Sequence, residues 1–292
     1  MAEIRPAKLK EVSVNGTTLY YTEQGEGEPM VLVHGGLSDY RMWEGQLAAF
    51  TRQYRVIAYS RRYAYPGKSD DDSVGYSVVP HARDLAAFIR QLKLGPVHLV
   101  GHSYGAYTSL VTAMEHPELV KTLCLGEPPI MPLLTNTEEG NKLLFGFVTN
   151  TQLPSAQAFE RGDEIEGTKI FLAGVMGEDA FYERMTPEVQ QQINENIQEL
   201  RGIVCPKIIF FFWPFITSTD VRKVTAPTLL MTGEKSPRFM IRITEELEKC
   251  LPHYERTIIP GASHEMEMDN PEAFNEAVLR FLEKNKDKVA SA

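Results

Sequence analysis

Cysteine is scarce in this sequence. Cys124, Cys205 and Cys250 are the three cysteines among 292 residues, and they stand far apart. An odd number of scattered cysteines does not provide the disulfide framework typical of small secreted proteins. Residues 1–10 also contain no apolar segment of the kind that a secretory signal requires. We therefore expect a protein of a reducing compartment, with a cytoplasmic location.

Long hydrophobic runs and clusters of positive charge are missing as well. The longest apolar run, residues 208–216, is too short to cross a bilayer and contains Pro214. The formal net charge is −9, and no basic cluster exceeds Arg61-Arg62, which argues against nucleic-acid binding. Neither an H-E-x-x-H motif nor a P-loop occurs. We expect a monomer or homodimer that takes a small molecule, without membrane span, nucleic acid, metal or cofactor.

The most informative segment is the pentapeptide Gly-His-Ser-Tyr-Gly at residues 101–105. A short apolar, β-branched run precedes it at 97–100, and residues 106–114 follow it with helical spacing of apolar positions. G-x-S-x-G between a strand and a helix is typical of a nucleophile elbow, a sharp turn that presents a reactive serine. Glycine is needed on either side because a side chain there would clash with the neighbouring strand or helix. Ser103 is therefore the candidate nucleophile.

Short strands and helices alternate along most of the chain, which predicts a mostly parallel sheet with helices on both faces. An Asn-Gly pair at 15–16 joins the first two strands and predicts a hairpin. From 130 to 220 helices follow one another without a strand between them. We expect an α/β core of residues 1–129 and 221–292, and a helical cap of residues 130–220. The expected strands are 11–15, 18–23, 30–33, 54–59, 97–100, 119–125, 227–231 and 255–259; the expected helices are 40–50, 79–93, 106–114, 141–149, 164–176, 187–201, 237–250 and 270–284, with a frayed tail at 285–292.

The candidate base is chosen among the histidines that follow the serine. A serine hydroxyl needs a base to take its proton, and the expected chain order with an elbow serine is serine, acid, histidine. His116 closes the elbow helix, and His253 precedes a strand at the opposite edge of the sheet. His264 lies in a glycine-containing loop after a strand, at the edge that carries Ser103. We therefore choose His264.

Two carboxylates are candidates for the acid that orients the base. Glu127 ends the strand that follows the elbow, on the edge that carries the nucleophile, and Gly126 and Pro128 restrict the backbone around it. Glu234 follows a later strand, where many enzymes with an elbow serine carry G-x-x-D. The Asp position is Ser236 in this chain. We favour Glu127 and keep Glu234 as the alternative.

Catalysis at a carbonyl also needs backbone N–H groups aimed at the negative charge that develops there. Tyr104, the residue after the nucleophile, is expected to supply one, and Gly36 the other. A glycine at the second position lets the substrate approach closely. The candidate substrate-binding residues are Leu37, Trp213 and Met266.

Three motifs resemble those of the α/β-hydrolase fold family: His-Gly-Gly at 34–36, the pentapeptide at 101–105 and Gly-Ala-Ser-His at 261–264. The resemblance extends from the hairpin to the last helix and implies an α/β-hydrolase fold with the cap in its usual place. The position of Glu127 resembles that of the acid in some haloalkane dehalogenases and zearalenone-lactonase-like members. Dehalogenases and epoxide hydrolases of this fold carry Asp as nucleophile, so the serine argues against both. The loop at 60–69 departs from the D-x-R-G-x-G-x-S that the family often has.

These residues and the resemblance predict a serine hydrolase that cleaves a carboxylic ester or lactone of a small to medium apolar substrate. Ser103 would attack the carbonyl, His264 would carry the proton, and Glu127 would orient His264. The same residues support other chemistry, because a fold does not determine a function. The alternatives are hydrolysis of a carbon–carbon bond, cofactor-free haloperoxidase or perhydrolase activity, and a ligand receptor with slow turnover.

Overall fold

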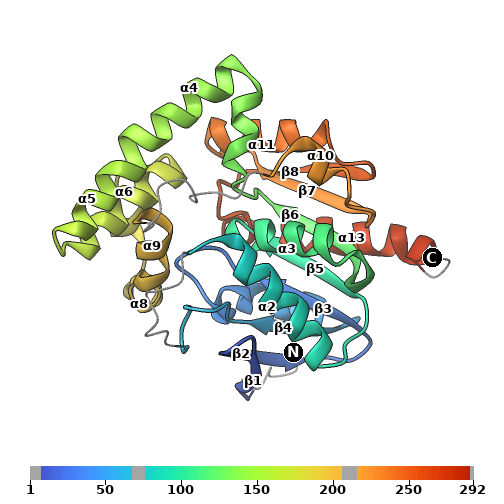
Figure 1. Cartoon of the computed structure of the whole chain (residues 1–292). Helices are drawn as coiled ribbons and strands as arrows, with labels where there is room; N and C mark the ends of the chain where they lie inside the picture. Colours follow the sequence, from blue (N-terminus) through green and yellow to red (C-terminus); the bar gives the residue numbers. More distant parts are fainter. Residues whose placement is uncertain (1–7, 68–75, 206–215, 290–292) are drawn as a thin grey trace.

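A computed structural model describes residues 8–67, 76–205 and 216–289. Within these residues, eight strands form one sheet in the order β1-β2-β4-β3-β5-β6-β7-β8 (Figure 1). The pairs β1–β2 and β2–β4 are antiparallel, and every other neighbouring pair is parallel, which confirms the predicted sheet. The strands are β1 (Lys10–Val14), β2 (Thr17–Gln24), β3 (Glu28–Val33), β4 (Tyr54–Tyr59), β5 (Val97–His102), β6 (Val120–Gly126), β7 (Thr228–Gly233) and β8 (Tyr254–Ile259).

The predicted hairpin is present at the start of the sheet. Asn15 and Gly16 both have positive φ, 44° and 75°, and Val14 pairs directly with Thr17. Two consecutive residues with positive φ are the geometry of a tight two-residue hairpin turn, and Asn-Gly adopts it at little cost. The turn therefore sets the register of β1 against β2.

Helices cover both faces of the sheet, because the strands bury side chains on both. In β3, Val31 and Val33 belong to the hydrophobic core on the side of α2 and α3, whereas Met30 and Leu32 belong to the core on the side of α1 and α13. Alternate residues of a strand point to opposite faces, so the fully apolar run needs two covering layers. The helices of this α/β core are η1 (Tyr40–Trp43), α1 (Glu44–Phe50), α2 (Val78–Gln91), α3 (Tyr104–Glu115), η2 (Pro117–Leu119), α11 (Arg238–Glu248), α12 (Met266–Asp269) and α13 (Pro271–Val289). The short helix α10 (Ser218–Val221) spans the predicted boundary between residues 220 and 221.

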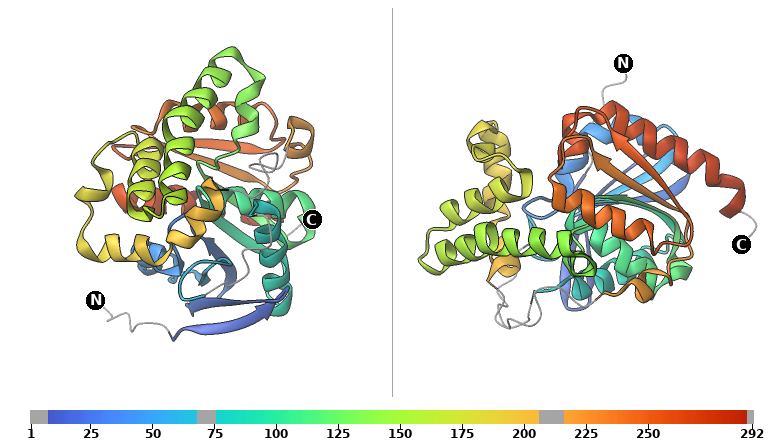
Figure 2. Two further views of the ribbon diagram at one scale, coloured as in Figure 1. Left: turned by 60° about the vertical axis from the view of Figure 1, so that its left-hand side comes forward. Right: turned by 90° about the horizontal axis from the view of Figure 1, so that it is seen from above.

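Between β6 and β7 the described residues form helices and no strand, and the helices from α4 to α9 lie to one side of the sheet (Figure 2). They are η3 (Met131–Asn136), α4 (Glu138–Phe147), η4 (Val148–Gln152), α5 (Leu153–Glu160), α6 (Glu164–Met176), α7 (Phe181–Arg184), α8 (Pro187–Glu195) and α9 (Ile197–Val204). We call this group the cap. The backbone stays helical from α4 through η4 into α5, and η4 is a π turn within that continuous helix.

Three predicted helices differ from the structure. The helix expected at 141–149 is part of the longer helical segment from α4 to α5. The helix expected at 187–201 is interrupted at Asn196, whose buried side chain donates to Asp39 at 2.9 Å and accepts from the Tyr65 backbone N–H at 2.8 Å. Bonds to these residues of the α/β core hold Asn196 outside a regular helix. The tail expected to fray from residue 285 continues α13 to Val289.

Among residues 8–67, 76–205 and 216–289, no helix combines the length and hydrophobicity that a membrane span needs.

Candidate active site

Ser103 occupies a sharp turn between β5 and α3. Its backbone angles, φ 49° and ψ −121°, lie outside the regions that residues other than glycine usually adopt. Such a conformation costs about 1–3 kcal/mol. A Cβ on Gly101 would lie 2.7 Å from the Cα of Ala106, and one on Gly105 would lie 2.0 Å from the carbonyl oxygen of Val33. Gly101 is therefore required because it packs against α3, and Gly105 because it packs against β3. The Ser103 N–H donates to the Gly126 carbonyl at 2.7 Å.

His264 and Glu127 meet at the ends of β8 and β6. Nδ1 of His264 donates to Oε2 of Glu127 at 2.6 Å, and both side chains are buried. The other carboxylate oxygen accepts from the N–H of Gly233 at 2.9 Å. Because Nδ1 carries the proton in this bond, the neutral ring has its lone pair on Nε2. This is the arrangement of a histidine oriented to take a proton.

Glu234 lies away from the histidine side chain. Its exposed carboxylate accepts from the backbone N–H of Gly261 at 2.7 Å, and so it anchors the loop that carries His264 from outside. A Cβ on Gly233 would lie 2.1 Å from the carbonyl oxygen of Ser263, so this loop packs directly on the end of β7. The structure brings Glu127, and not Glu234, to His264. Ser236 is buried, and its hydroxyl has no hydrogen-bond partner among the described residues.

The electrostatics of the pair raise the pKa of the histidine. Burial lowers the pKa of His264, but the hydrogen bond and the negative charge of Glu127 raise it more, and Glu265 adds to the increase. The resulting pKa lies above the ordinary value of 6.5. Glu127 therefore stabilises the imidazolium that forms when His264 takes a proton.

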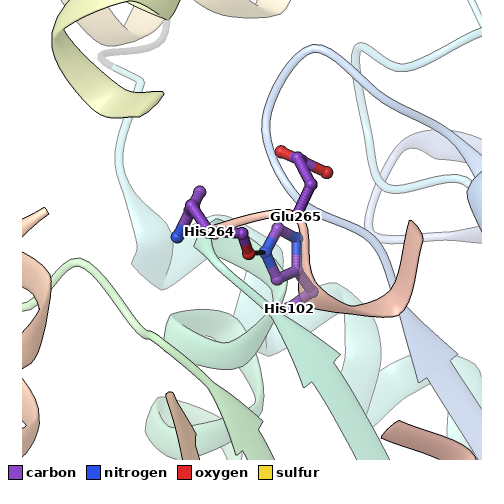
Figure 3. Close-up of side chains that lie close together, drawn as sticks. All are labelled: His102, His264 and Glu265. Carbon is purple, nitrogen blue, oxygen red and sulfur yellow. Dashed lines mark hydrogen bonds between the residues drawn. The ribbon is translucent and has the colours of Figure 1, made fainter. Parts of the chain in front are cut away.

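His102 supports the same loop from the elbow. Its Nε2 donates to the backbone oxygen of His264 at 2.8 Å (Figure 3). Burial lowers the pKa of His102 to about 4, so its ring is neutral near pH 7. Within the described residues, His102, His264 and Glu265 form the one group of three or more His, Cys, Asp or Glu residues with a potential metal-ligand atom from each within 4.8 Å of the others. One nitrogen of each ring is already engaged, Nε2 of His102 and Nδ1 of His264.

Gly36 and Tyr104 line the cavity that Ser103 lines. Neither backbone N–H has a hydrogen-bond partner within the part of the chain that the structure describes. A Cβ on Gly35 would lie 3.1 Å from Nδ1 of His102 and 3.3 Å from Cβ of Ser103, so the glycine lets this loop lie against the elbow. The two N–H groups are therefore available at the place where the negative charge of an attacked carbonyl would develop.

Comparison with known proteins gives the family of the chain. The sequence matches the model of the alpha/beta hydrolase fold family over residues 28–271. The chain belongs to this family. A curated relative, the (E)-2-((N-methylformamido)methylene)succinate hydrolase of Acinetobacter baylyi, is 25% identical to this α/β hydrolase over 276 residues, which cover 92% of the chain and 95% of the relative.

Two further similarities cover nearly the whole α/β hydrolase. A non-heme haloperoxidase of Rhodococcus erythropolis is 27% identical over 277 residues, covering 92% of this chain and 97% of the relative. The crystal structure of the carboxylesterase CesB of Bacillus subtilis matches with a TM-score of 0.72 at 20% identity, over 96% of this chain and 92% of that one. At 20% identity, this structural match shows a shared fold.

Arg61 holds the loop of the predicted oxyanion hole in this α/β hydrolase. Its buried guanidinium donates to the carbonyl oxygens of His34, at 3.0 Å, and Gly35, at 2.7 Å. It also pairs with Glu199 of α9 in the cap, at 2.5 Å, and Tyr76 donates to the same carboxylate at 2.7 Å. The sequence pointed to the loop at 60–69 as unusual, but no local signal links Arg61 to a residue of the cap.

Two adjoining cavities lie between the cap and the α/β core. The inner cavity, of about 90 Å³, contains Ser103 and His264 at its base. The outer cavity measures about 160 Å³ and shares Leu37, Met176 and Glu265 with the inner one. The inner cavity is lined mainly by apolar side chains, among them Met42, Met131, Phe147, Phe171, Leu172, Val175, Met176, Ile203 and Met240. The walls suit an apolar substrate.

The predicted substrate-binding residues lie in different places. Leu37 lines both cavities. Met266 is not among the lining residues of either cavity; it is fully buried in the hydrophobic core that also contains Phe274, below the end of β6. Trp213 lies outside the described residues. The sequence analysis missed the cap residues of the inner cavity, because helical spacing alone does not tell which face of a cap helix covers the serine.

Proposed function

We propose that this α/β hydrolase is a serine hydrolase that cleaves a carboxylic ester or lactone of a small to medium apolar substrate through an acyl-enzyme. The observation that carries the proposal is the 2.6 Å hydrogen bond between His264 and Glu127, in a histidine that lines the same cavity as the strained Ser103. That bond leaves the lone pair of Nε2 free to take a proton.

The proposed mechanism has two half-reactions, in each of which His264 first accepts a proton and then donates it. The hydroxyl oxygen of Ser103 attacks the carbonyl carbon while Nε2 of His264 takes its proton, and Glu127 stabilises the imidazolium. The N–H groups of Gly36 and Tyr104 stabilise the oxyanion. His264 then gives the proton to the departing alcohol. In the second half, His264 takes a proton from a water molecule that attacks the acyl carbon, and it returns that proton to the oxygen of Ser103 as the bond to the acyl group breaks and the carboxylic acid leaves.

A second candidate activity has support in one comparison. If hydrogen peroxide replaces water in the second half-reaction, the acyl-enzyme yields a peracid, and a haloperoxidase is 27% identical to this chain. The same serine, histidine and glutamate would carry both reactions. Ester hydrolysis remains the first proposal, because it needs no second reactant besides water.

The domain division and the cellular setting are proposals as well. The division into a core of residues 1–129 and 221–292 and a cap of residues 130–220 is supported by the absence of strands between β6 and β7 in the described residues. A cytoplasmic location is supported by the three free cysteines, two of them buried. We propose a monomer or homodimer, without nucleic acid as partner.

Hydrolysis of p-nitrophenyl esters from acetate to long-chain acyl groups tests the function. We expect wild-type turnover with an optimum at short to medium chains, and none above background in Ser103→Ala. Ser236→Ala, which removes another buried hydroxyl, is the matched control and should retain turnover. A folded wild-type protein that hydrolyses no ester, or a Ser103→Ala variant that stays active, would refute the proposal.

A further inference from the structure

Gln152 is a polar side chain in the apolar inner cavity that the mechanism does not use. It lines the cavity together with Ser103 and His264, and only 3% of its surface is exposed. Its carboxamide makes no hydrogen bond to another described residue, and it faces the cavity and is not sealed in the core. An amide that faces a cavity without a protein partner has its two N–H groups and its oxygen available for a ligand there. A ligand in the cavity would supply the missing partner.

The π turn of the cap is what brings Gln152 to the cavity. Phe147, at the end of α4, lines the same cavity five positions earlier. In a regular α-helix, residues five apart point about 140° away from each other, so they would not share a face. A π turn closes hydrogen bonds over five residues and therefore places Gln152 on the side of Phe147.

The turn is fixed by close packing against the next helix. A Cβ on Gly174 of α6 would lie 2.0 Å from Oγ1 of Thr151, the residue before Gln152. This close contact requires glycine at position 174, and it packs the π turn directly against α6. The backbone that carries Gln152 therefore belongs to a packed helix and not to a loop.

The charges around the cavities define which group Gln152 can meet. Glu265 lines both cavities, and its negative charge contributes to the raised pKa of His264. Among the described lining residues, Arg41 is the one cation, and it is already paired with Asp39 at 2.6 Å and Glu195 at 2.7 Å. A carboxylate in the substrate would thus meet a like charge and no free cation.

We propose that Gln152 determines substrate specificity: its carboxamide N–H donates a hydrogen bond to an uncharged oxygen of the substrate, an ether, carbonyl or hydroxyl oxygen, in an otherwise apolar chain. The inference rests on the proposed ester hydrolysis and names the class of ester: neutral, with one oxygen at a defined distance from the scissile bond. An apolar isostere lacking that oxygen leaves the amide unpartnered and reacts more slowly.

Pairs of esters that exchange a methylene group for oxygen test the proposal. On the acyl side the pairs are p-nitrophenyl butyrate with methoxyacetate, pentanoate with 3-methoxypropanoate, and hexanoate with 4-methoxybutanoate. On the alcohol side the pair is n-butyl butyrate with 2-methoxyethyl butyrate, followed by pH-stat titration. The measured quantity is the ratio of kcat/KM within each pair, after subtraction of the uncatalysed rate. Because both members are tested on one preparation, the fraction of folded enzyme cancels.

We expect wild type to prefer the oxygen-bearing member of at least one pair by about three- to tenfold. Gln152→Met, which keeps the length but removes the donor, should abolish that preference. Gln152→Glu should abolish it too, since a carboxylate accepts but does not donate. Val175→Ala, which enlarges the cavity without changing its polarity, is the matched control and should retain the preference.

Two results would overturn the inference while leaving ester hydrolysis intact. One is a wild type that prefers no oxygen-bearing ester in any pair. The other is a preference that Gln152→Met retains unchanged. Absence of turnover with every ester would instead refute the proposed function, and the inference with it, so the two failures are distinguishable.

Discussion

The guanidinium of Arg61 and the carboxylate of Glu199 lie 2.5 Å apart, with both side chains completely buried between the α/β core and the cap. The same guanidinium donates to the carbonyl oxygens of His34 and Gly35, next to Gly36. One ion pair therefore links the cap to the loop that the mechanism uses for the oxyanion.

Removing the acid of this pair should destabilise the protein. Glu199→Ala leaves a buried guanidinium without its counter-charge, and we expect a loss of about 3–5 kcal/mol in the free energy of unfolding. Denaturant unfolding measures it. Glu138→Ala, which breaks an exposed pair with Lys142, is the matched control and should change nothing measurable. Equal stability of Glu199→Ala and wild type would show that the pair does not hold the cap.

The assignment of the acid predicts a contrast between two glutamates. Glu127→Gln keeps the shape but removes the charge that orients and stabilises His264, so kcat should fall by roughly a thousandfold or more. Glu234→Gln removes only an exposed bond to the Gly261 N–H, and kcat should change little. Steady-state hydrolysis of the best p-nitrophenyl ester compares the two. The opposite ranking would transfer the role to Glu234.

The pH profile of kcat/KM follows from the pKa of His264. The base must be neutral, and Glu127 raises its pKa above 6.5, so activity should rise with pH through a midpoint above 6.5. Glu127→Gln removes the charge that raises the pKa while burial still lowers it. The residual activity of that variant should therefore have its midpoint at lower pH. A midpoint that stays fixed, or moves to higher pH, would contradict the pairing.

A buried carboxyl behind the site predicts a pH-dependent stability. Burial, together with the charges of Glu265 and Asp269, raises the pKa of Glu267 well above 4.5, and neither carboxyl oxygen has a hydrogen-bond partner in the described residues. The folded chain keeps this proton after the unfolded chain has lost it. Its favourable contribution is thus complete below pH 4.5 and is lost as pH rises through the folded pKa, by about 1.4 kcal/mol per unit.

Glu267→Gln should remove this dependence. The difference in unfolding free energy between variant and wild type should grow in favour of the variant from pH 5 to pH 8. Glu276→Gln, on an exposed position of α13, serves as the control and should give a difference independent of pH. A Glu267→Gln variant whose difference from wild type is the same at both pH values would refute the raised pKa.

The sequence predicted those strands, helices and turns that are determined by residues close together along the chain. The strand before Ser103, the helix after it and the Asn15-Gly16 turn follow from backbone sterics and apolar spacing, which a sequence displays directly. The pairing of Glu127 with His264 could also be predicted, because both residues lie at the carboxyl ends of strands and these ends share one edge of a parallel sheet.

What the sequence could not show depends on contacts between distant segments. Asn196 interrupts a helix because it bonds to Asp39 and Tyr65. The π turn before Gln152 is seated by Gly174, which stands on another helix. Met266 was chosen for its nearness to His264 along the chain, but its direction is set by packing against Phe274 in the core.

The pair of Arg61 and Glu199 also bears on exchange of caps between members of the family. A foreign cap grafted onto this core would have to bring an acid to the place of Glu199, or the core would have to give up Arg61 at the same time. Either single replacement leaves one charge buried alone. The two segments are therefore expected to be inherited together, and a chimera that preserves both partners is the one that should fold.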